Sequence, residues 1–381
     1  MKNKKLFWIF ALSSAVYFTQ GIEGLPAQGL FYYLKETLSF PAEKIMLLSS
    51  LITFAWLVKP LIGYLIDHWL NKRFWIFISL GLDIVFALML GLVQLPIFIL
   101  LLLLIFGSTS SAFRDVAADG VMCVEGKQHQ ATGKIQSIQW MAILVAGLFT
   151  GLGGGVLAQK WGYQSAFLCL VPVYLAVALI AFFYQETKIT APPATLLGDL
   201  KLIFRDKRIL IIGLFIFLYK YSPSFGTPLF FIQRDVFKWD KIWIGTLSTV
   251  STVFGVIGAA CYYKFSQRIK LRTWLYASVI LGALTTLSYL YYTPQTAVVY
   301  DIVYSLLGMF IFLMVMDFMA RHSVKGLEAT SFAFLCSLNN LAVVASNLSG
   351  AWLYPLIGLK WLIVLSAGAS FLCLFLINRI E

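Results

Sequence analysis

The sequence predicts an all-α membrane protein with twelve transmembrane helices in two pseudo-symmetric six-helix halves. Hydrophobic residues make up 60% of the 381-residue chain and charged residues only 12%, whereas a soluble domain carries about 25% charged residues. The apolar runs are about 20 residues long, which is the length of helix that crosses roughly 30 Å of hydrocarbon. An internal sequence repeat relates the first half of the chain to the second.

The apolar runs are separated by short polar loops, and each run is predicted to be one transmembrane helix. Residues 6–18 resemble the apolar part of a secretory signal, but no small-residue cleavage site follows before Gln20, so we expect this segment to stay in the protein. The predicted spans are 6–33, 43–66, 74–93, 97–121, 135–156, 163–184, 209–232, 243–263, 272–291, 296–320, 331–354 and 361–378.

The positions of lysine and arginine predict the orientation in the membrane. If both termini are cytoplasmic, nineteen of the 29 lysine and arginine residues fall in loops on the cytoplasmic side and seven on the other side. Short loops with an excess of these residues stay inside. The net charge of +12 is therefore largely a topology signal, with no basic groove that indicates nucleic acid. We expect a monomer in a bacterial inner membrane.

The two halves match at an offset near 199 residues. The segment Leu30–Glu36 aligns with Leu229–Asp235, and Asp119 aligns with Asp317, while the pair at 160–161 aligns with the pair at 360–361. The predicted domains are an N-terminal half (1–184), a cytoplasmic connector (185–208) and a C-terminal half (209–381). Two parallel six-helix halves are the architecture of the major facilitator fold, in which rocking exposes a site between the halves to each side in turn.

The loop after the second span supports this fold independently. Residues Gly63 to Arg73 resemble the facilitator signature G-x-x-x-D-[RK]-x-G-[RK]-[RK]. Gly63 permits close helix approach, Asp67 can cap a neighbouring helix N-terminus, and the cations can pair with acids on the cytoplasmic face.

The first two spans and the fourth carry more specific motifs. They contain the run Tyr32–Glu36, the segment Trp56–Gly63 followed by Asp67, and Asp115, Asp119 and Glu125 in the fourth span. These segments resemble the folate-biopterin transporter family, with its YYLK, PW-x-KP-x-x-G-x-x-x-D and D-x-x-x-D-A-x-x-x-E patterns. The resemblance implies a secondary transporter that moves folate, biopterin or a related pteridine or organic anion, with protons.

Other solutes remain possible alternatives at this point. Muropeptide permeases and acetyl-coenzyme A transporters carry a related segment around Lys59 and Asp67. The alternatives are a facilitator-fold carrier of muropeptides, acyl-coenzyme A or drug-like amphiphiles, and a membrane receptor that does not transport. No phosphate-binding loop, metal-ligand spacing or cofactor motif is present in the sequence, so we expect neither an enzyme nor a cofactor.

Ionisable residues inside apolar spans are candidate transport residues, because a charge at membrane depth is costly and usually faces a protein interior. Glu23 is a candidate proton-coupling carboxylate or a structural ion-pair partner. Lys59 is a candidate ligand of a substrate anion, a partner of Asp115 or Asp119, or a snorkelling lysine. Lys220 is a candidate ligand of a carboxylate such as the glutamyl tail of folate, or a partner of Glu23.

Polar and aromatic residues near these charges are candidate lining residues, since a pterin ring stacks on aromatic rings and has polar edges. Gln20, Gln28 and Trp140 are predicted to contact substrate, with packing as the alternative for each. The remaining charged residues are predicted to form a cytoplasmic gate: Asp67, Arg73, Arg114, Asp115, Asp119 and Asp317.

Overall fold

The computed structural model of the chain consists of helices joined by short turns and loops in the part that it describes. It describes residues 2–40, 48, 51–52, 54–187, 198, 201, 203, 205–239, 241–268 and 271–377. The chain divides into two compact units: unit 1 comprises Met1–Leu196 with Ser323–Ala333, and unit 2 comprises Leu197–His322 with Phe334–Glu381. The helix α14 (Glu328–Ser370) thus begins in unit 1 and continues in unit 2.

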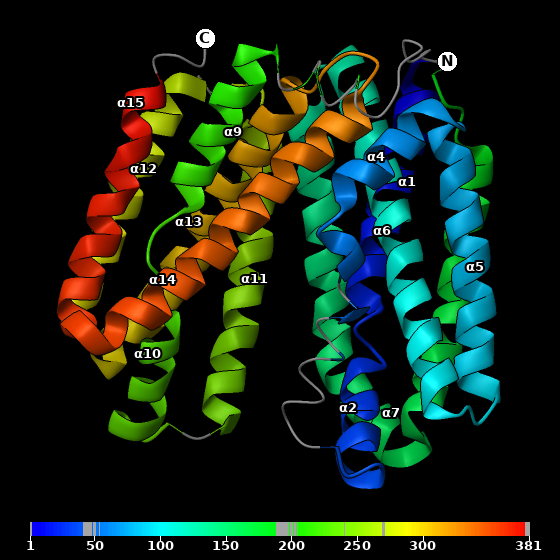
Figure 1. Cartoon of the computed structure of the whole chain (residues 1–381), viewed down its shortest axis with the longest axis horizontal. Helices are drawn as coiled ribbons and strands as arrows, with labels where there is room; N and C mark the ends of the chain where they lie inside the picture. Colours follow the sequence, from blue (N-terminus) through cyan, green and yellow to red (C-terminus); the bar gives the residue numbers. More distant parts are fainter. Residues whose placement is uncertain are drawn as a thin grey trace. The chain divides into compact units, whose positions relative to one another are not determined.

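Unit 1 is a helical bundle in which α1 packs along α7, and α5 lies beside both α6 and α7 (Figure 1). Apart from the first turn of α14, its elements are α1 (Lys2–Ile22), α2 (Ala27–Tyr32), the π-helical turn η1 (Tyr33–Thr37), η2 (Phe54–Trp56), α4 (Lys59–His68), α5 (Lys72–Leu92), α6 (Ile97–Gln128) and α7 (Thr132–Phe183). Large apolar side chains such as Phe98 and Phe182 remain exposed on the helices, as expected for surfaces that face lipid.

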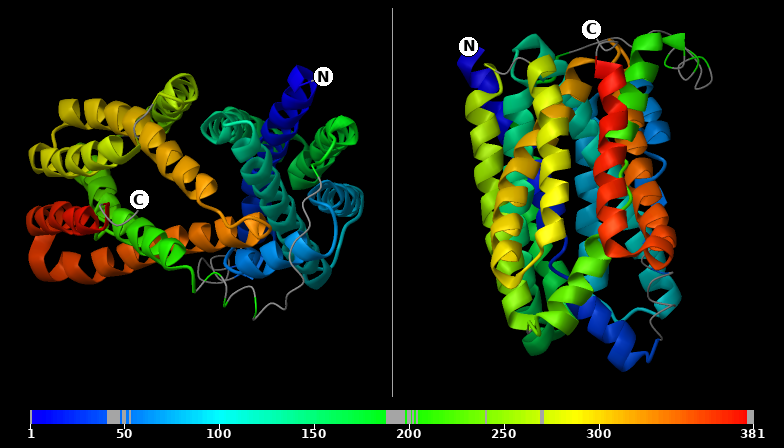
Figure 2. Two further views of the ribbon diagram at one scale, coloured as in Figure 1. Left: turned by 90° about the horizontal axis from the view of Figure 1, so that it is seen from above. Right: turned by 90° about the vertical axis from the view of Figure 1, so that its left-hand side faces the viewer.

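Unit 2 is built in the same way, with α11 packed along α13 and with α12 beside α13 and α15 (Figure 2). Asp206 begins its first long helix, because its carboxylate accepts hydrogen bonds from the backbone N–H groups of Arg208 (2.9 Å) and Ile209 (3.4 Å). Its elements besides α14 are α9 (Lys207–Lys220), α10 (Gly226–Phe231), the π-helical turn η3 (Ile232–Val236), α11 (Lys241–Phe265), α12 (Leu271–Ser288), η4 (Tyr289–Tyr291), α13 (Pro294–Arg321), η5 (Phe371–Cys373) and α15 (Leu374–Ile377).

Seven helices in the described ranges are long and apolar enough to cross a membrane. Two continuous elements, α7 and α14, each run through two predicted spans. The 52-residue α7 has a left-handed backbone conformation at Gly162 (φ 72°), and α14 has the same conformation at Gly358 (φ 71°). Glycine tolerates this conformation without steric cost. A straight 52-residue helix would be about 78 Å long, more than twice the hydrocarbon thickness, and the kink divides it into two bilayer-length segments.

The same kinks correct one detail of the repeat. Gly162 and Gly358 occupy equivalent positions, so the halves align here at an offset of 196 residues. Lys160 and Trp161 precede their kink, whereas Lys360 and Trp361 follow theirs. The sequence match between these two pairs is therefore not a structural equivalence.

Both halves interrupt their first predicted span at equivalent places. The chain leaves the helix between α1 and α2 at residues 23–26, and between α9 and α10 at residues 221–225 (Figure 1). Each break is followed by a six-residue helix, a π-helical turn and one residue with positive φ, which is Ser39 (52°) in unit 1 and Lys238 (55°) in unit 2. The π-helical turns and these residues are all 199 residues apart, so the predicted repeat is present in the backbone.

Candidate functional site

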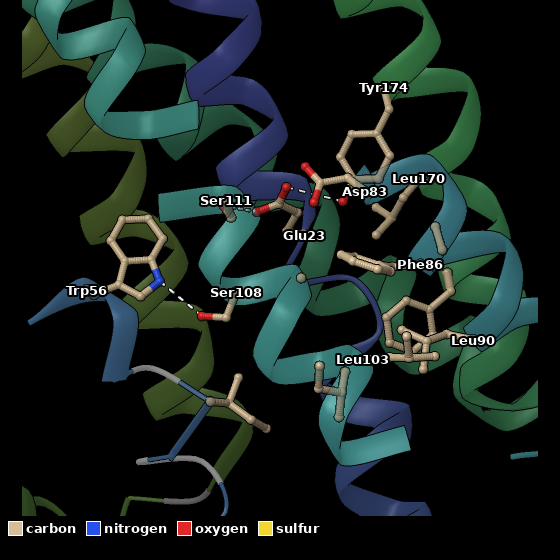
Figure 3. Close-up of a pocket in the computed structure, with 15 residues that line it drawn as sticks. Glu23, Trp56, Asp83, Phe86, Leu90, Leu103, Ser108, Ser111, Leu170 and Tyr174 are labelled. Atoms are coloured by element: carbon tan, nitrogen blue, oxygen red, sulfur yellow. Dashed lines mark hydrogen bonds between the residues drawn. The ribbon is translucent and has the colours of Figure 1, made fainter. Parts of the chain in front are cut away.

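A buried cluster of charges lies at the first helix break in unit 1. Arg114 on α6 donates from its two terminal nitrogens to Glu23, in the break after α1, and to Asp83 on α5. Ser111 donates to the second oxygen of Glu23 (2.8 Å), and the Tyr174 hydroxyl donates to the first (3.2 Å). Figure 3 shows Glu23, Asp83, Ser111 and Tyr174 pointing toward one another. We call these five residues the Arg114 cluster.

The Arg114 cluster holds one guanidinium and two carboxylates, so it carries a net charge of −1 when all three groups are ionised. The Arg114 side chain is fully buried, and Asp83 is 4% exposed, whereas Glu23 is 21% exposed. Burying an ion costs several kcal/mol unless it is paired and hydrogen-bonded. Glu23 is the more exposed of the two carboxylates in the cluster.

A cavity of about 220 Å³ adjoins the cluster. Glu23 and Asp83 lie on its wall, and the indole of Trp56 lies on another part of the wall, where its N–H donates to Ser108 (3.2 Å; Figure 3). The rest of the lining is mainly apolar: Ile52, Phe86, Ala87, Leu90, Leu103, Leu104, Gly107, Phe167 and Leu170. An apolar cavity with a few convergent polar groups is the usual form of a small-molecule site.

A second charged network lies around Asp115 on α6. Lys59, the first residue of α4, donates to one oxygen of Asp115 at 2.5 Å, and the Gln20 amide donates to the other oxygen at 2.5 Å. The Lys59 ammonium also lies 4.5 Å from the centre of the Trp56 ring. The structure thus brings together three of the predicted residues, and Asp115 is the acid with which Lys59 pairs.

Asp119 lies one helical turn beyond Asp115, and its carboxylate accepts a hydrogen bond from Tyr17 on α1 (2.7 Å). Trp140 on α7 meets Tyr17 edge to face, with 6.2 Å between the ring centres. The predicted lining residue Gln28 belongs to α2, but its side chain lies outside the part that the structure describes. Asp119 and Trp140, two further predicted residues, thus both contact α1 through Tyr17.

Asp67 caps the first turn of α14, as the sequence predicts for a neighbouring helix. Its carboxylate accepts hydrogen bonds from the backbone N–H of Ala329 (3.3 Å) and from both the N–H and the hydroxyl of Thr330 (2.8 Å each). Lys72 completes the contact with an ion pair to Asp67 at 3.2 Å. Gly63 makes this approach possible, because a Cβ there would lie 2.7 Å from the Thr330 Cα.

Arg73, in the first turn of α5, binds the end of α7. Its guanidinium donates to the carbonyl groups of Ala181 (2.8 Å) and Phe182 (2.6 Å) in the last turn of α7. In return, Glu186 just after α7 accepts hydrogen bonds from the backbone N–H groups of Lys72 (3.0 Å) and Arg73 (2.8 Å) at the start of α5. Each helix end is thus satisfied by a charged group from the other.

The other predicted gate residues fall in separate places. Asp317 on α13 in unit 2 pairs with Arg321 and accepts a hydrogen bond from Tyr262 (2.8 Å). Arg114, predicted as a residue of the cytoplasmic gate, pairs with Glu23 and Asp83 and not with the acids of that gate. The physical reason is that consecutive residues on a helix point to different faces, so Arg114 and its neighbour Asp115 contact different helices.

Lys220 is the last residue of α9 and borders a separate cavity within unit 2. Its ammonium lies 4.9 Å from the centre of the Phe312 ring. Among the described residues of unit 2, no carboxylate forms an ion pair with Lys220. The predicted alternative of a pair with Glu23 would join unit 2 to unit 1, and it stays a prediction.

The sequence analysis missed Asp83, which completes the Arg114 cluster. The signal was available, since Asp83 is the only charged residue in the predicted span 74–93 and such residues mark functional or paired sites. Ser111 and Tyr174 were also missed, but polar residues of these types are common in transmembrane helices, and only the fold shows that they face Glu23.

The sequence model of the BT1 family matches residues 20–377, which is most of the chain. The chain belongs to the BT1 family. It is 26% identical to the folate-biopterin transporter of Synechocystis sp., a match that covers 92% of this chain and 76% of the relative. It is 20% identical to folate transporter 1 of Plasmodium falciparum, covering 90% of this chain and 72% of the relative. The predicted resemblance to folate-biopterin transporters is confirmed.

Solved structures confirm the fold of this BT1 family member. The E. coli fucose–proton symporter, a major facilitator superfamily transporter, matches with a TM-score of 0.77 at 12% identity, covering 98% of both chains. The human organic anion transporter MFSD10 matches with a TM-score of 0.72 at 17% identity, covering 98% of this chain and 99% of the other. The protein is thus a multi-pass integral membrane transporter of the major facilitator fold.

Proposed function

We propose that this transporter moves folate, biopterin or a related pteridine or organic anion by alternating access, and that protons drive it. The relatives named as folate and folate-biopterin transporters support the substrate class. The interruption of the first span in both halves supports alternating access around a fixed site, because broken helices in transporters line substrate and ion sites. The halves 1–184 and 209–381 are then the parts that move.

The Arg114 cluster is the observation that supports proton coupling most strongly. Protonation of Glu23 converts the cluster from a net charge of −1 to a neutral arrangement in which Arg114 still pairs with Asp83. A net charge at membrane depth is costly. The transporter therefore changes between its outward-open and inward-open conformations with the cluster in its protonated, neutral form. Each proton then contributes about 2.3 kcal/mol per 100 mV, which corresponds to roughly 50-fold accumulation of a neutral solute.

The remaining candidates have two proposed roles. Lys59, Gln20, Gln28, Trp140 and Lys220 contact the solute, with Lys59 released from Asp115 when an anionic group arrives. The proposed gate residues are Asp67, Arg73, Asp115, Asp119 and Asp317, of which Asp67 and Arg73 bind the ends of neighbouring helices. The cap on the first turn of α14 is lost when the transporter opens to the cytoplasm. In this proposal the protein works as a monomer in a bacterial inner membrane with both termini cytoplasmic.

Uptake into proteoliposomes tests the substrate class. We expect radiolabelled folate or biopterin to enter vesicles that hold the purified protein, and unlabelled pteridines to compete. A panel of muropeptides, acyl-coenzyme A and drug-like cations serves as the comparison. If correctly folded protein transports none of the pteridines but one of the other solutes competes or is taken up, the pteridine assignment is wrong while the fold stands.

A further inference from the structure

The cavity beside Lys220 has a polar wall that the proposed function leaves unexplained. It has a volume of about 200 Å³ and lies within unit 2 between the end of α9, α12, α13 and the last turn of α14. Residues with hydroxyl groups line the same cavity as Lys220: Ser222, Thr285, Thr286, Tyr304 and Ser370. Those of Thr286 and Tyr304 form no hydrogen bond with the part of the chain that the structure describes. The wall thus offers one cation and free hydroxyl donors.

The charge of Lys220 lacks an acidic partner among the described residues of its own unit. The Lys220 ammonium lies over the face of the Phe312 ring, which attracts a cation only weakly compared with a carboxylate. A charge at membrane depth is costly unless an opposite charge meets it. A ligand that brings a negative charge into this cavity would therefore gain an ion pair in a setting with little water.

The backbone next to Lys220 is held in place before any ligand arrives. In the break after α9, Ser224 donates its N–H to the carbonyl of Ser346 on α14 (3.0 Å), and the Ser346 hydroxyl donates to the carbonyl of Ser222. Gly350 on α14 contacts the same break so closely that a Cβ there would collide with the carbonyl oxygen of Ser224. Lys220 is thus attached to a fixed point and not to a loose loop.

The repeat shows that this cavity differs in charge from its counterpart in unit 1. Glu23, Asp83 and Arg114 correspond to Ser222, Gly282 and Phe312 at the offsets that align the π-helical turns (199) and the pair Asp119 and Asp317 (198). All three counterparts line the cavity of unit 2. The second half therefore has neither the two acids nor the arginine at these positions, and the charged residue that lines its cavity is Lys220.

We propose that the cavity beside Lys220 binds a carboxylate group of the transported solute and makes the carrier prefer carboxylate-bearing pteridines to uncharged ones. This inference rests on the proposed function. A drug-sized ligand fills about 300–1,000 Å³, so the cavity of about 200 Å³ accommodates one acidic arm and not a whole two-ring solute. Folate carries glutamyl carboxylates, whereas biopterin carries none.

Parallel uptake of folate and biopterin tests the preference. We expect Lys220→Met to lower the ratio of folate uptake to biopterin uptake at least tenfold, while Lys220→Arg keeps most of the folate uptake. Lys264→Met is the matched control, because the Lys264 ammonium also lies over a phenylalanine ring (5.7 Å) but outside the cavity. Equal losses for the two solutes, or no loss of folate uptake, would overturn the proposal.

A binding measurement separates this proposal from the proposed function and does not depend on a stable variant. The probe is p-aminobenzoylglutamate, which has the carboxylates of folate but no pterin ring. We expect it to bind purified wild-type protein and its uncharged diamide not to bind. If the protein transports neither pteridine but binds the probe through Lys220, the proposed function is wrong and the carboxylate pocket stands. If the wild-type protein does not bind the probe, the proposal of a carboxylate pocket is wrong.

The negative charge could also come from an anionic lipid headgroup. The folate and biopterin uptakes are therefore compared in vesicles of phosphatidylcholine alone and in vesicles with added phosphatidylglycerol. We expect the preference for folate to be the same in both. If anionic lipid abolishes the preference, the cavity holds a lipid headgroup and the proposal is wrong.

Discussion

Replacing Arg114 by methionine removes the cation that neutralises two buried acids. Arg114 is fully buried and pairs with Glu23 and Asp83. Removing one partner from a buried ion pair costs about 3–5 kcal/mol, and the partial exposure of Glu23 favours the lower end, about 3 kcal/mol. A loss of 1 kcal/mol lowers the melting temperature of a unit of about 200 residues by about 2–4 °C, so we expect a fall of about 6–12 °C.

The assay is thermal unfolding of the purified protein in detergent, followed by intrinsic fluorescence. Arg208→Met is the matched control, since Arg208 is exposed at the start of α9, and we expect its melting temperature to stay within about 1 °C of the wild type. The triple variant Arg114→Met, Glu23→Gln and Asp83→Asn removes the whole charged set and should recover most of the loss. A fall under about 2 °C for Arg114→Met, or a triple variant no more stable than the single one, would refute the reasoning.

Two further predictions concern helix contacts. Asp67→Ala removes the cap on the first turn of α14 and should lower the free energy of unfolding by about 1–2 kcal/mol. The backbone amide hydrogen of Thr330 should then exchange with solvent about tenfold faster. An unchanged exchange rate would contradict the cap. Gly350→Ala places a Cβ against the carbonyl of Ser224 and should lower the melting temperature clearly, whereas Gly368→Ala in the same helix meets nothing within 4 Å and should be neutral or stabilising. Equal melting temperatures for the two alanine variants would show that the break is not held as described.

The fold was predictable because it depends on features that are local in the sequence. Apolar length predicts each span, and a fixed offset between similar segments predicts the repeat, which reappears in the π-helical turns after both helix breaks. The continuous helices through Gly162 and Gly358 were not predictable in the same way. Loop length alone does not tell whether a chain turns through a loop or through one glycine with positive φ.

The site was predictable in its residue types but only partly in its pairs. Glu23, Lys59 and Lys220 were identified because charges are rare in apolar spans. Their partners depend on the rotation and tilt of packed helices, which a single sequence does not reveal. Arg114 therefore belongs with Glu23 and with the overlooked Asp83, although Asp115 is its neighbour in the chain.

The most direct test of the account is the accumulation of radiolabelled folate in proteoliposomes with an inward proton gradient, compared between the wild type and Glu23→Gln. We predict that the wild type accumulates folate above equilibrium and that a protonophore abolishes this accumulation. The Glu23→Gln variant should only exchange folate to equilibrium, since its cluster no longer changes charge. Accumulation by Glu23→Gln equal to that of the wild type, or wild-type uptake that ignores the gradient, would contradict proton coupling through the Arg114 cluster.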